Sequence, residues 1–209
     1  MCVVLVLAVA STMAVTRAEP QPTLTVRLYN PAAIPPLELL TAGRTAEAIL
    51  RETDLDVMVR HCGRPVLPEH LDRCDEPLQA SEVVVRVINA AAFNTGLPAD
   101  AYGVTYVVQK TNRGWLATVF SDRIEKAAVR AGVDAGTLLG RVMAHEVGHL
   151  LLGVDYHGAS GLMRAEWPDG QLGATSDQWR FSTSEAAGMH RALESISREL
   201  DAAPPLTRF

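Results

Sequence analysis

Apolar residues recur at helical spacing between residues 135 and 152 and form one continuous face. Asp134 suits the N-cap of such a helix, and Gly153 suits the position just after its end. We therefore predict an amphipathic helix over 135–152 that packs against the core of the domain. Its apolar face consists of Leu138, Leu139, Val142, Val147, Leu150 and Leu151.

Five shorter apolar runs predict strands. The first alternates apolar and polar residues and stops at Asn30-Pro31, as a strand does. The last two flank the tetrapeptide 111–114, whose asparagine and glycine suit the turn of a hairpin. The five runs are residues 24–29, 57–59, 83–88, 104–109 and 115–120.

Three further helices complete the pattern. Residues 39–54 combine good helix formers with apolar positions and lie between two strands, which indicates a right-handed crossover and parallel pairing. Asp122–Glu125 and Ser182–Glu185 have the spacing of capping boxes. They predict one helix from Asp122 to about Ala131, ended by Gly132, and a C-terminal helix. The core-facing residues of the C-terminal helix are Met189, Leu193, Ile196 and Leu200.

This order of elements predicts an α/β domain, and composition limits what it can do. The chain has 209 residues, of which 48% are hydrophobic and 21% charged, enough for one well-packed domain. We place that domain at 19–209 and expect a monomer. The formal net charge is −5 and the lysines are Lys110 and Lys126, which argues against a nucleic-acid surface.

Residues 1–18 differ from the rest of the chain. Val3 to Val15 are apolar except for Ser11 and Thr12, and Ala18 precedes Glu19 as a small residue suited to signal-peptidase cleavage. We interpret 1–18 as a signal peptide, with an uncleaved anchor as the alternative because this region has no lysine or arginine before the apolar run. The run is short for a membrane span, so we expect a secreted or periplasmic protein without stable membrane insertion.

Cysteine usage agrees with export. Cys2 would leave with the signal peptide, so Cys62 and Cys74 remain as an even pair that closes a short loop. We predict a disulfide between them. As an alternative, His61-Cys62-Gly63-Arg64-Pro65 resembles the propeptide cysteine switch of matrix metalloproteases, in which a free thiolate blocks the zinc. We disfavour it because Cys62 follows two predicted elements of the domain itself, and no separate propeptide precedes them.

The predicted helix over 135–152 carries the candidate chemistry. His145 and His149 are four residues apart, so both imidazoles can reach one metal ion from the same face of the helix. Glu146 lies about 100° round the helix, beside the ion but not forced to bind it. This spacing is typical of a zinc hydrolase in which the glutamate is the general base.

A catalytic zinc usually has three protein ligands and one open position, so one ligand must come from beyond the helix. We favour His157, whose neutral imidazole follows the turn at Gly153. Asp155 is the alternative, because aspartate also binds zinc. We expect His61, His70 and His190 to lie outside the site.

The run from His145 to His157 resembles the metzincin clan of zinc endopeptidases. The clan's motif is His-Glu-x-x-His-x-x-Gly-x-x-His/Asp, followed by a methionine turn beneath the metal. His145, Glu146 and His149 match it, and Gly161-Leu162-Met163 is similar to the turn. Gly153 comes one residue late and His157 two residues late, while Ala165 stands where some members have a tyrosine.

The resemblance implies an α+β fold with a twisted mixed sheet, an antiparallel edge strand above a cleft, and a smaller C-terminal part that ends in a helix. It implies a Zn²⁺-dependent metalloendopeptidase that hydrolyses peptide or protein substrates through metal-activated water, with Glu146 as general base. Strand 104–109 or 115–120 would hold the peptide, and residues 158–180, with Trp167 and Trp179, would line the far side of the cleft.

Two other classes of function stay open. A non-catalytic zinc-binding interaction module would need the histidines but has little use for Glu146. A zinc-dependent endoribonuclease would use three histidines, but we expect such a protein to be cytosolic and more basic. Net charge and the predicted export disfavour the endoribonuclease.

Overall fold

The computed structural model describes most of the chain between residues 21 and 202. The predicted signal peptide at 1–18 and His70 lie outside the described residues, so those predictions stay untested. No helix in the described part of the chain is both long and apolar enough to cross a membrane. The described ranges are 21–63, 73–92, 97–98, 100–108, 110–111, 113–153, 155, 157–174 and 176–202.

The described strands form one five-stranded mixed sheet in the order β2-β1-β3-β5-β4. The pairs β1–β2, β1–β3 and β3–β5 are parallel, and β4 pairs antiparallel with β5 at one edge. This confirms the parallel crossover and the antiparallel edge. The strands are β1 (Thr23–Tyr29), β2 (Asp56–Cys62), β3 (Glu82–Ile88), β4 (Gly103–Val108) and β5 (Arg113–Phe120), and the helices are α1 (Pro36–Arg51), α2 (Ser121–Ala131), α3 (Ala135–Leu152) and α4 (Thr183–Ala202).

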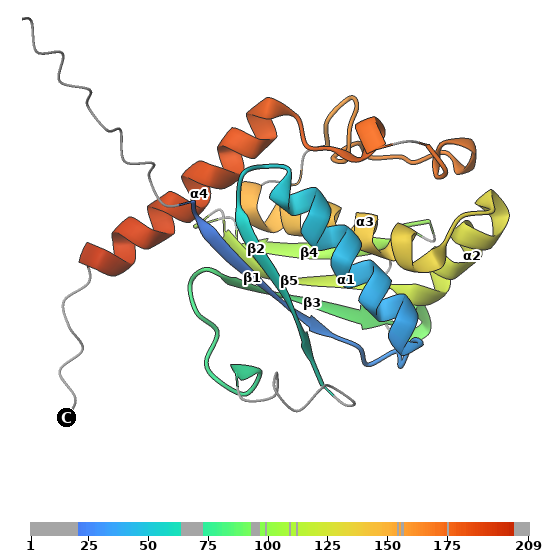
Figure 1. Ribbon diagram of the computed structural model, residues 1–209, viewed down its shortest axis with the longest axis horizontal. Coiled ribbons are helices and arrows are strands. Elements are labelled where there is room, and N and C mark those ends of the chain that lie inside the picture. Colours follow the sequence, from blue (N-terminus) through green and yellow to red (C-terminus); the bar gives the residue numbers. More distant parts are fainter. Residues whose placement is uncertain are drawn as a thin grey trace, which may run out of the picture.

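Helices α1 and α3 pack against each other over one face of the sheet (Figure 1). Side chains alternate between the two faces of a strand, and those that face the helices are almost fully buried. The connection 153–182, orange in Figure 1, lies on the side of α3 away from the sheet. Helix α4, in red, packs against α3 and runs on past the end of the sheet. Helix α3 is therefore buried on two sides. The residues under the helices include Leu24, Val26, Val85, Val87, Ala117 and Val119.

Local signals decided the helix ends, and some predictions at these ends were wrong. Helix α1 was predicted over 39–54 but runs from Pro36 to Arg51. It begins at Pro36 because the fixed φ of proline suits the first turn of a helix. It ends before Asp54, whose φ of 60° is not helical. The capping box at Ser182–Glu185 is confirmed, with amide-to-side-chain hydrogen bonds of 2.7 and 3.3 Å. The one predicted at 122–125 is wrong, because the Asp122 carboxylate instead accepts from the amide of Ala90 at 2.7 Å.

The two edges of the sheet differ. The amide of Asp56 donates to Pro22 on the β1 side, so the main-chain groups of Val57 and Val59 point outward from the free edge of β2. Arg51 donates to the Val57 carbonyl at 2.7 and 3.1 Å, and the Val59 amide donates to the Glu47 carboxylate at 3.3 Å. Helix α1 thus occupies the outer edge of β2, whereas no described strand pairs with the outer edge of β4.

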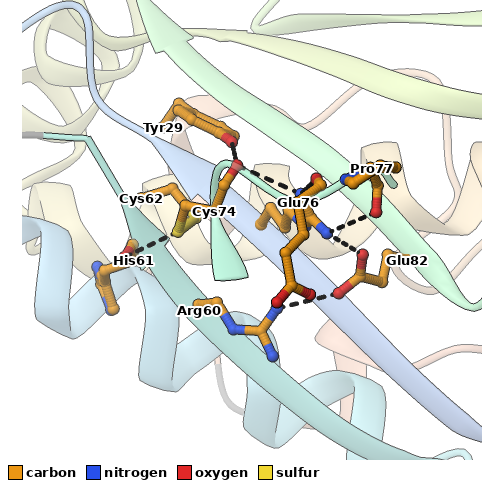
Figure 2. The surroundings of a disulfide bond; sticks show 9 residues. Tyr29, Arg60, His61, Cys62, Cys74, Glu76, Pro77 and Glu82 are labelled. Carbon is orange, nitrogen blue, oxygen red and sulfur yellow. Dashed lines mark hydrogen bonds and ion pairs between the residues drawn. A yellow bond between two sulfur atoms is a disulfide. The ribbon is translucent and has the colours of Figure 1, made fainter. Parts of the chain in front are cut away.

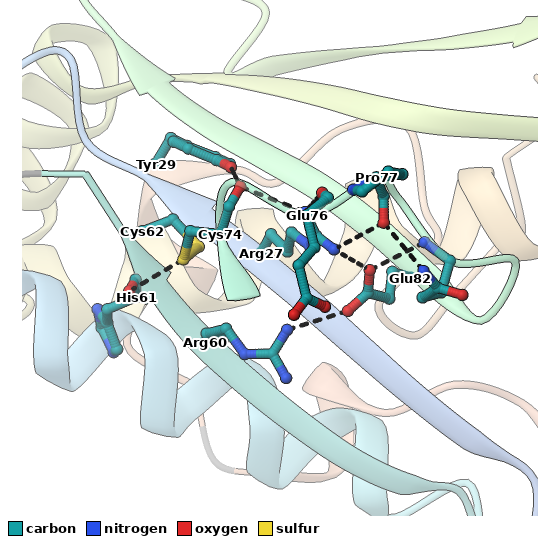
Figure 3. A network of polar contacts seen from close by, with 10 residues as sticks. Arg27, Tyr29, Arg60, His61, Cys62, Cys74, Glu76, Pro77 and Glu82 are labelled. Carbon is teal, nitrogen blue, oxygen red and sulfur yellow. Dashed lines mark hydrogen bonds and ion pairs between the residues drawn. A yellow bond between two sulfur atoms is a disulfide. The ribbon is translucent and has the colours of Figure 1, made fainter. Parts of the chain in front are cut away.

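The predicted disulfide is present between Cys62, at the end of β2, and Cys74, with a Cα–Cα distance of 5.6 Å (Figure 2). Hydrogen bonds hold the segment 73–82 beside it against the sheet face that the helices leave uncovered. The buried guanidinium of Arg27 donates to the carbonyls of Cys74, Glu76 and Pro77 at 3.3, 2.7 and 3.2 Å (Figure 3). Cystine and arginine therefore fix the same segment.

A buried carboxylate completes this network. Glu82 pairs with Arg27, accepts from Arg60 at 3.0 Å, and accepts from the amide of Gln79 at 2.9 Å (Figure 3). Burial alone would raise the pKa of Glu82, but these hydrogen bonds outweigh it and the pKa lies below its usual value. The carboxylate is consequently ionised between its two arginines.

Candidate metal centre

Two of the predicted metal ligands lie together on α3. The helix begins at Asp134, whose carboxylate accepts from the Thr137 amide at 2.7 Å, and ends at Gly153 with a left-handed φ of 65°, as predicted. Between these ends, His145 and His149 place their Nε2 atoms 3.0 Å apart. Both residues are less than a tenth exposed. Two ring nitrogens that converge in this way present their lone pairs to one point.

His157 joins them from the chain beyond the helix. The left-handed turn at Gly153 reverses the chain, and the ligand atoms of His145, His149 and His157 all lie within 4.8 Å of one another. The ring of His157 stacks on that of His145 at 5.4 Å between centroids and meets His149 edge-on at 4.9 Å. Asp155 lines the adjacent cavity but does not belong to this cluster.

The carbonyl of Leu162 sets the orientation of His145. This oxygen lies 2.8 Å from Nδ1 of His145, so Nδ1 carries the proton and Nε2 keeps its lone pair. Burial, reinforced by the neighbouring His149, lowers the pKa of His145 to about 3. His145 is therefore neutral at physiological pH, which is the form of imidazole that binds metals.

Met163 lies directly beneath helix α3. It is fully buried, and a Cβ added to Gly148 would come within 2.7 Å of its sulfur, so the helix and the turn approach each other closely only because residue 148 is a glycine. Gly161 begins this turn with a φ of 76°, and the Leu162 amide donates to the Arg180 carbonyl at 2.9 Å. The segment 161–163, which we predicted to be a methionine turn, therefore lies against the helix that carries His145 and His149.

Glu146 is buried beside the histidines and turned toward β4. The hydroxyl of Thr105 lies 2.6 Å from its carboxylate and 3.1 Å from its main-chain carbonyl, so the single hydroxyl proton is shared between these two acceptors, with the carboxylate the nearer. Burial raises the pKa of Glu146 to about 7, against the opposing effect of the Thr105 hydrogen bond. Sequence analysis missed both Thr105 and the Leu162 carbonyl, because a threonine in a strand and a main-chain oxygen carry no pattern of their own.

Two cavities of about 500 and 640 Å³ meet at the histidines. The smaller runs along the start of β4 to Asp155, and the larger runs past Tyr102 to Trp167 and Pro168. Trp167 contacts the ring of His145 edge-on at 5.3 Å, whereas Trp179 is buried behind it. Of the two tryptophans, Trp167 therefore lines the cleft. Both cavities share Gly103, His145, Glu146 and His157.

The donor set fits zinc. Three imidazoles with converging nitrogens, two of them buried, are ligands of the type and number that a catalytic zinc takes, and they leave a position for water. The other described histidines lie elsewhere, as predicted: His61 is on β2 beside Gly43, and His190 bonds to the Thr53 carbonyl at 2.6 Å. What this arrangement can do chemically is hold one metal ion next to a buried carboxyl group.

Comparison with known proteins gives a likeness of structure. No protein-family model and no curated protein matches the chain. Its structure is similar to a zinc-dependent peptidase from Methanocorpusculum labreanum strain Z, with 16% identity and a TM-score of 0.50 over 78% of this chain and 99% of that one. An archaemetzincin from Methanopyrus kandleri aligns over 88% of this chain and 99% of its own with 18% identity and a TM-score of 0.48.

The likeness to the Methanocorpusculum labreanum peptidase bears on the architecture. The mixed five-stranded sheet, the covering helices and the C-terminal helix agree with the plan that the sequence resemblance implied. The predicted fold class is therefore confirmed, and this chain shares its fold with a known zinc-dependent peptidase.

Proposed function

We propose that this protein is a zinc-dependent metalloendopeptidase. The observation that carries the proposal is the convergence of His145, His149 and His157, whose ligand atoms lie within 4.8 Å of one another, beside the buried carboxyl group of Glu146. A purely structural zinc site needs no such carboxyl group, whereas hydrolysis needs a base there. The shared fold with a zinc-dependent peptidase supports the same class.

Each residue has a role in this chemistry. His145, His149 and His157 would hold zinc, and the Leu162 carbonyl would keep His145 in the binding tautomer. Zinc, when bound, supplies a Lewis acid that polarises the scissile carbonyl and acidifies a water molecule. Glu146 takes the proton of the attacking water and gives it to the leaving amine. A pKa near 7 suits a group that must both accept and release a proton at neutral pH.

The cleft suits an extended peptide bound across the site. Cavities lie on both sides of the histidines, so substrate residues can occupy positions before and after the scissile bond. The outer edge of β4 borders the cleft and is open to pair with a peptide strand, while the outer edge of β2 is occupied by Arg51 and Glu47. We therefore assign peptide binding to β4 and cleavage within chains rather than at their ends.

Replacing Glu146 by alanine tests this proposal. Zinc-loaded wild type should cleave a mixed peptide library at internal bonds, and Glu146→Ala should lose cleavage while it keeps one zinc per chain. Glu125→Ala is the matched control, because Glu125 is an exposed carboxylate on α2. A wild type that binds zinc but cleaves nothing would support the non-catalytic zinc module instead.

We also propose that the protein works outside the cytosol as a monomer. The Cys62–Cys74 disulfide supports this location, because such bonds persist in oxidising compartments. N-terminal sequencing of exported protein should find Glu19 as the first residue. Recovery of an intact N-terminus from the membrane fraction would favour the uncleaved anchor.

A further inference from the structure

Gly103 and Thr105 of β4 face the carboxylate of Glu146. They are two residues apart on a strand, so both residues present the same face to α3. A Cβ added to Gly103 would lie 2.5 Å from Oε1 of Glu146, and the Thr105 hydroxyl lies 2.6 Å from Oε2. One carboxylate oxygen therefore occupies the space of a missing side chain, and the other accepts a hydrogen bond.

The main chain of the same two residues points in another direction. The Phe120 amide donates to the Tyr102 carbonyl at 2.8 Å, so Tyr102 and Phe120 form a hydrogen-bonded pair of the antiparallel ladder. Such pairs alternate with non-bonded pairs in an antiparallel ladder. Gly103 and Thr105 belong to the non-bonded pairs, and their amide and carbonyl groups point outward to the free edge of β4.

We propose that Gly103 and Thr105 form a seat that positions Glu146, built into the strand that binds the substrate. This inference rests on the proposed peptidase function. Thr105 is a positioning residue: its hydroxyl restricts the Glu146 carboxylate to one place, while its main chain is available to the peptide. The main-chain carbonyl of Glu146, 3.1 Å from the hydroxyl, is a second acceptor for the same proton and favours the threonine rotamer that faces Glu146.

The seat explains why the base and the peptide share one strand. A peptide paired with the edge of β4 takes its register from the main chain of residues 103–107. Glu146 takes its position from the same strand, through the Thr105 hydroxyl and the space beside Gly103. The distance between the base and the scissile bond is then set within a single strand. Positioning of this kind acts on the rate of the chemical step more than on substrate affinity.

Kinetics of three threonine variants test the proposal. Thr105→Val keeps the volume but removes the donor, so kcat should fall about ten- to a hundredfold, the usual loss for a supporting residue, with KM within about twofold. Thr105→Ser keeps the hydroxyl and should stay within about threefold of wild type. Thr118→Val is the control: Thr118 is buried on β5, also loses one hydrogen bond, to Arg86, and lies opposite Val104 away from the site.

Two kinetic results would overturn the seat: an unchanged kcat in Thr105→Val, or an equal loss of kcat in Thr105→Val and Thr105→Ser. Crystal structures supply a readout that needs no catalysis. The Glu146 carboxylate should leave β4 in Thr105→Val and in Gly103→Ala, and stay in Thr105→Ser. A carboxylate that keeps its place in both of the first two variants refutes the seat even if the enzyme proposal stands. If the carboxylate behaves as expected in these crystal structures but the zinc-loaded wild type cleaves no peptide, the enzyme proposal is refuted and the positioning of Glu146 by Gly103 and Thr105 stands.

Discussion

Replacing His157 by alanine should weaken zinc binding about a hundredfold. Zinc sites with four protein ligands bind the metal with about 10–16 kcal/mol at neutral pH, which is about 3 kcal/mol for each ligand. His157 is exposed, whereas His145 and His149 are buried, so its share lies toward the low end of that range. About 3 kcal/mol corresponds to roughly a hundredfold change in the dissociation constant.

The assay is a competition for zinc between the protein and a coloured chelator at pH 7. Asp155→Ala is the matched control, because Asp155 lines the same cavity two residues earlier but stands outside the histidine cluster, and its affinity should stay within about threefold of wild type. Peptidase activity at limiting zinc should fall in parallel with affinity in His157→Ala. A larger loss of affinity in Asp155→Ala than in His157→Ala would refute the reasoning and make aspartate the third ligand.

Three further predictions concern stability. Replacing Cys62 and Cys74 together by serine should lower the free energy of unfolding by about 3 kcal/mol, because the bond closes a loop with a sequence separation of 12; a loss below about 1 kcal/mol in a denaturant titration would contradict this. Glu82→Gln should cost about 3 kcal/mol and lower the melting temperature by roughly 6–12 °C, because Arg27 stays buried without its carboxylate; an unchanged melting temperature would refute the pairing. In zinc-free protein the folded pKa of Glu146, about 7, exceeds its unfolded value of 4.5, so the wild type should lose stability as the pH rises from 4.5 to 7. Glu146→Gln lacks this titration and should become more stable relative to the wild type over the same pH range. Parallel stability profiles of the two proteins against pH would count against a buried carboxyl group.

Helix α3 was predicted well from the sequence because several local signals agreed there. Asp134 and Gly153 set its ends, and the apolar stripe set its burial. Where a single signal stood alone, prediction was less successful. The capping-box pattern at 122–125 was overridden because the carboxylate of Asp122 found a partner in Ala90, 32 residues away along the chain.

The supporting shell of the site could not be predicted for a similar reason. His145, Glu146 and His149 follow from spacing along one helix, but the groups that orient them come from β4 and from the turn at 161–163. Thr105 matters because of where the sheet places its hydroxyl. The oxygen of Leu162 is a main-chain carbonyl, a group that every residue has. Contacts of this kind exist only after the chain has folded, so no pattern of residues along the sequence predicts them.

The unequal edges of the sheet also limit how this protein can associate with itself. Arg51 and Glu47 already bind the outward carbonyl of Val57 and the outward amide of Val59, so among the described strands the outer edge of β4 is the more accessible one for strand-to-strand pairing. Two molecules joined through β4 would leave their β2 edges outermost, where the side chains of Arg51 and Glu47 disfavour the addition of a further strand. Such a pair would cover the cleft beside the histidines, so self-association through β4 would compete with peptide binding at the same edge.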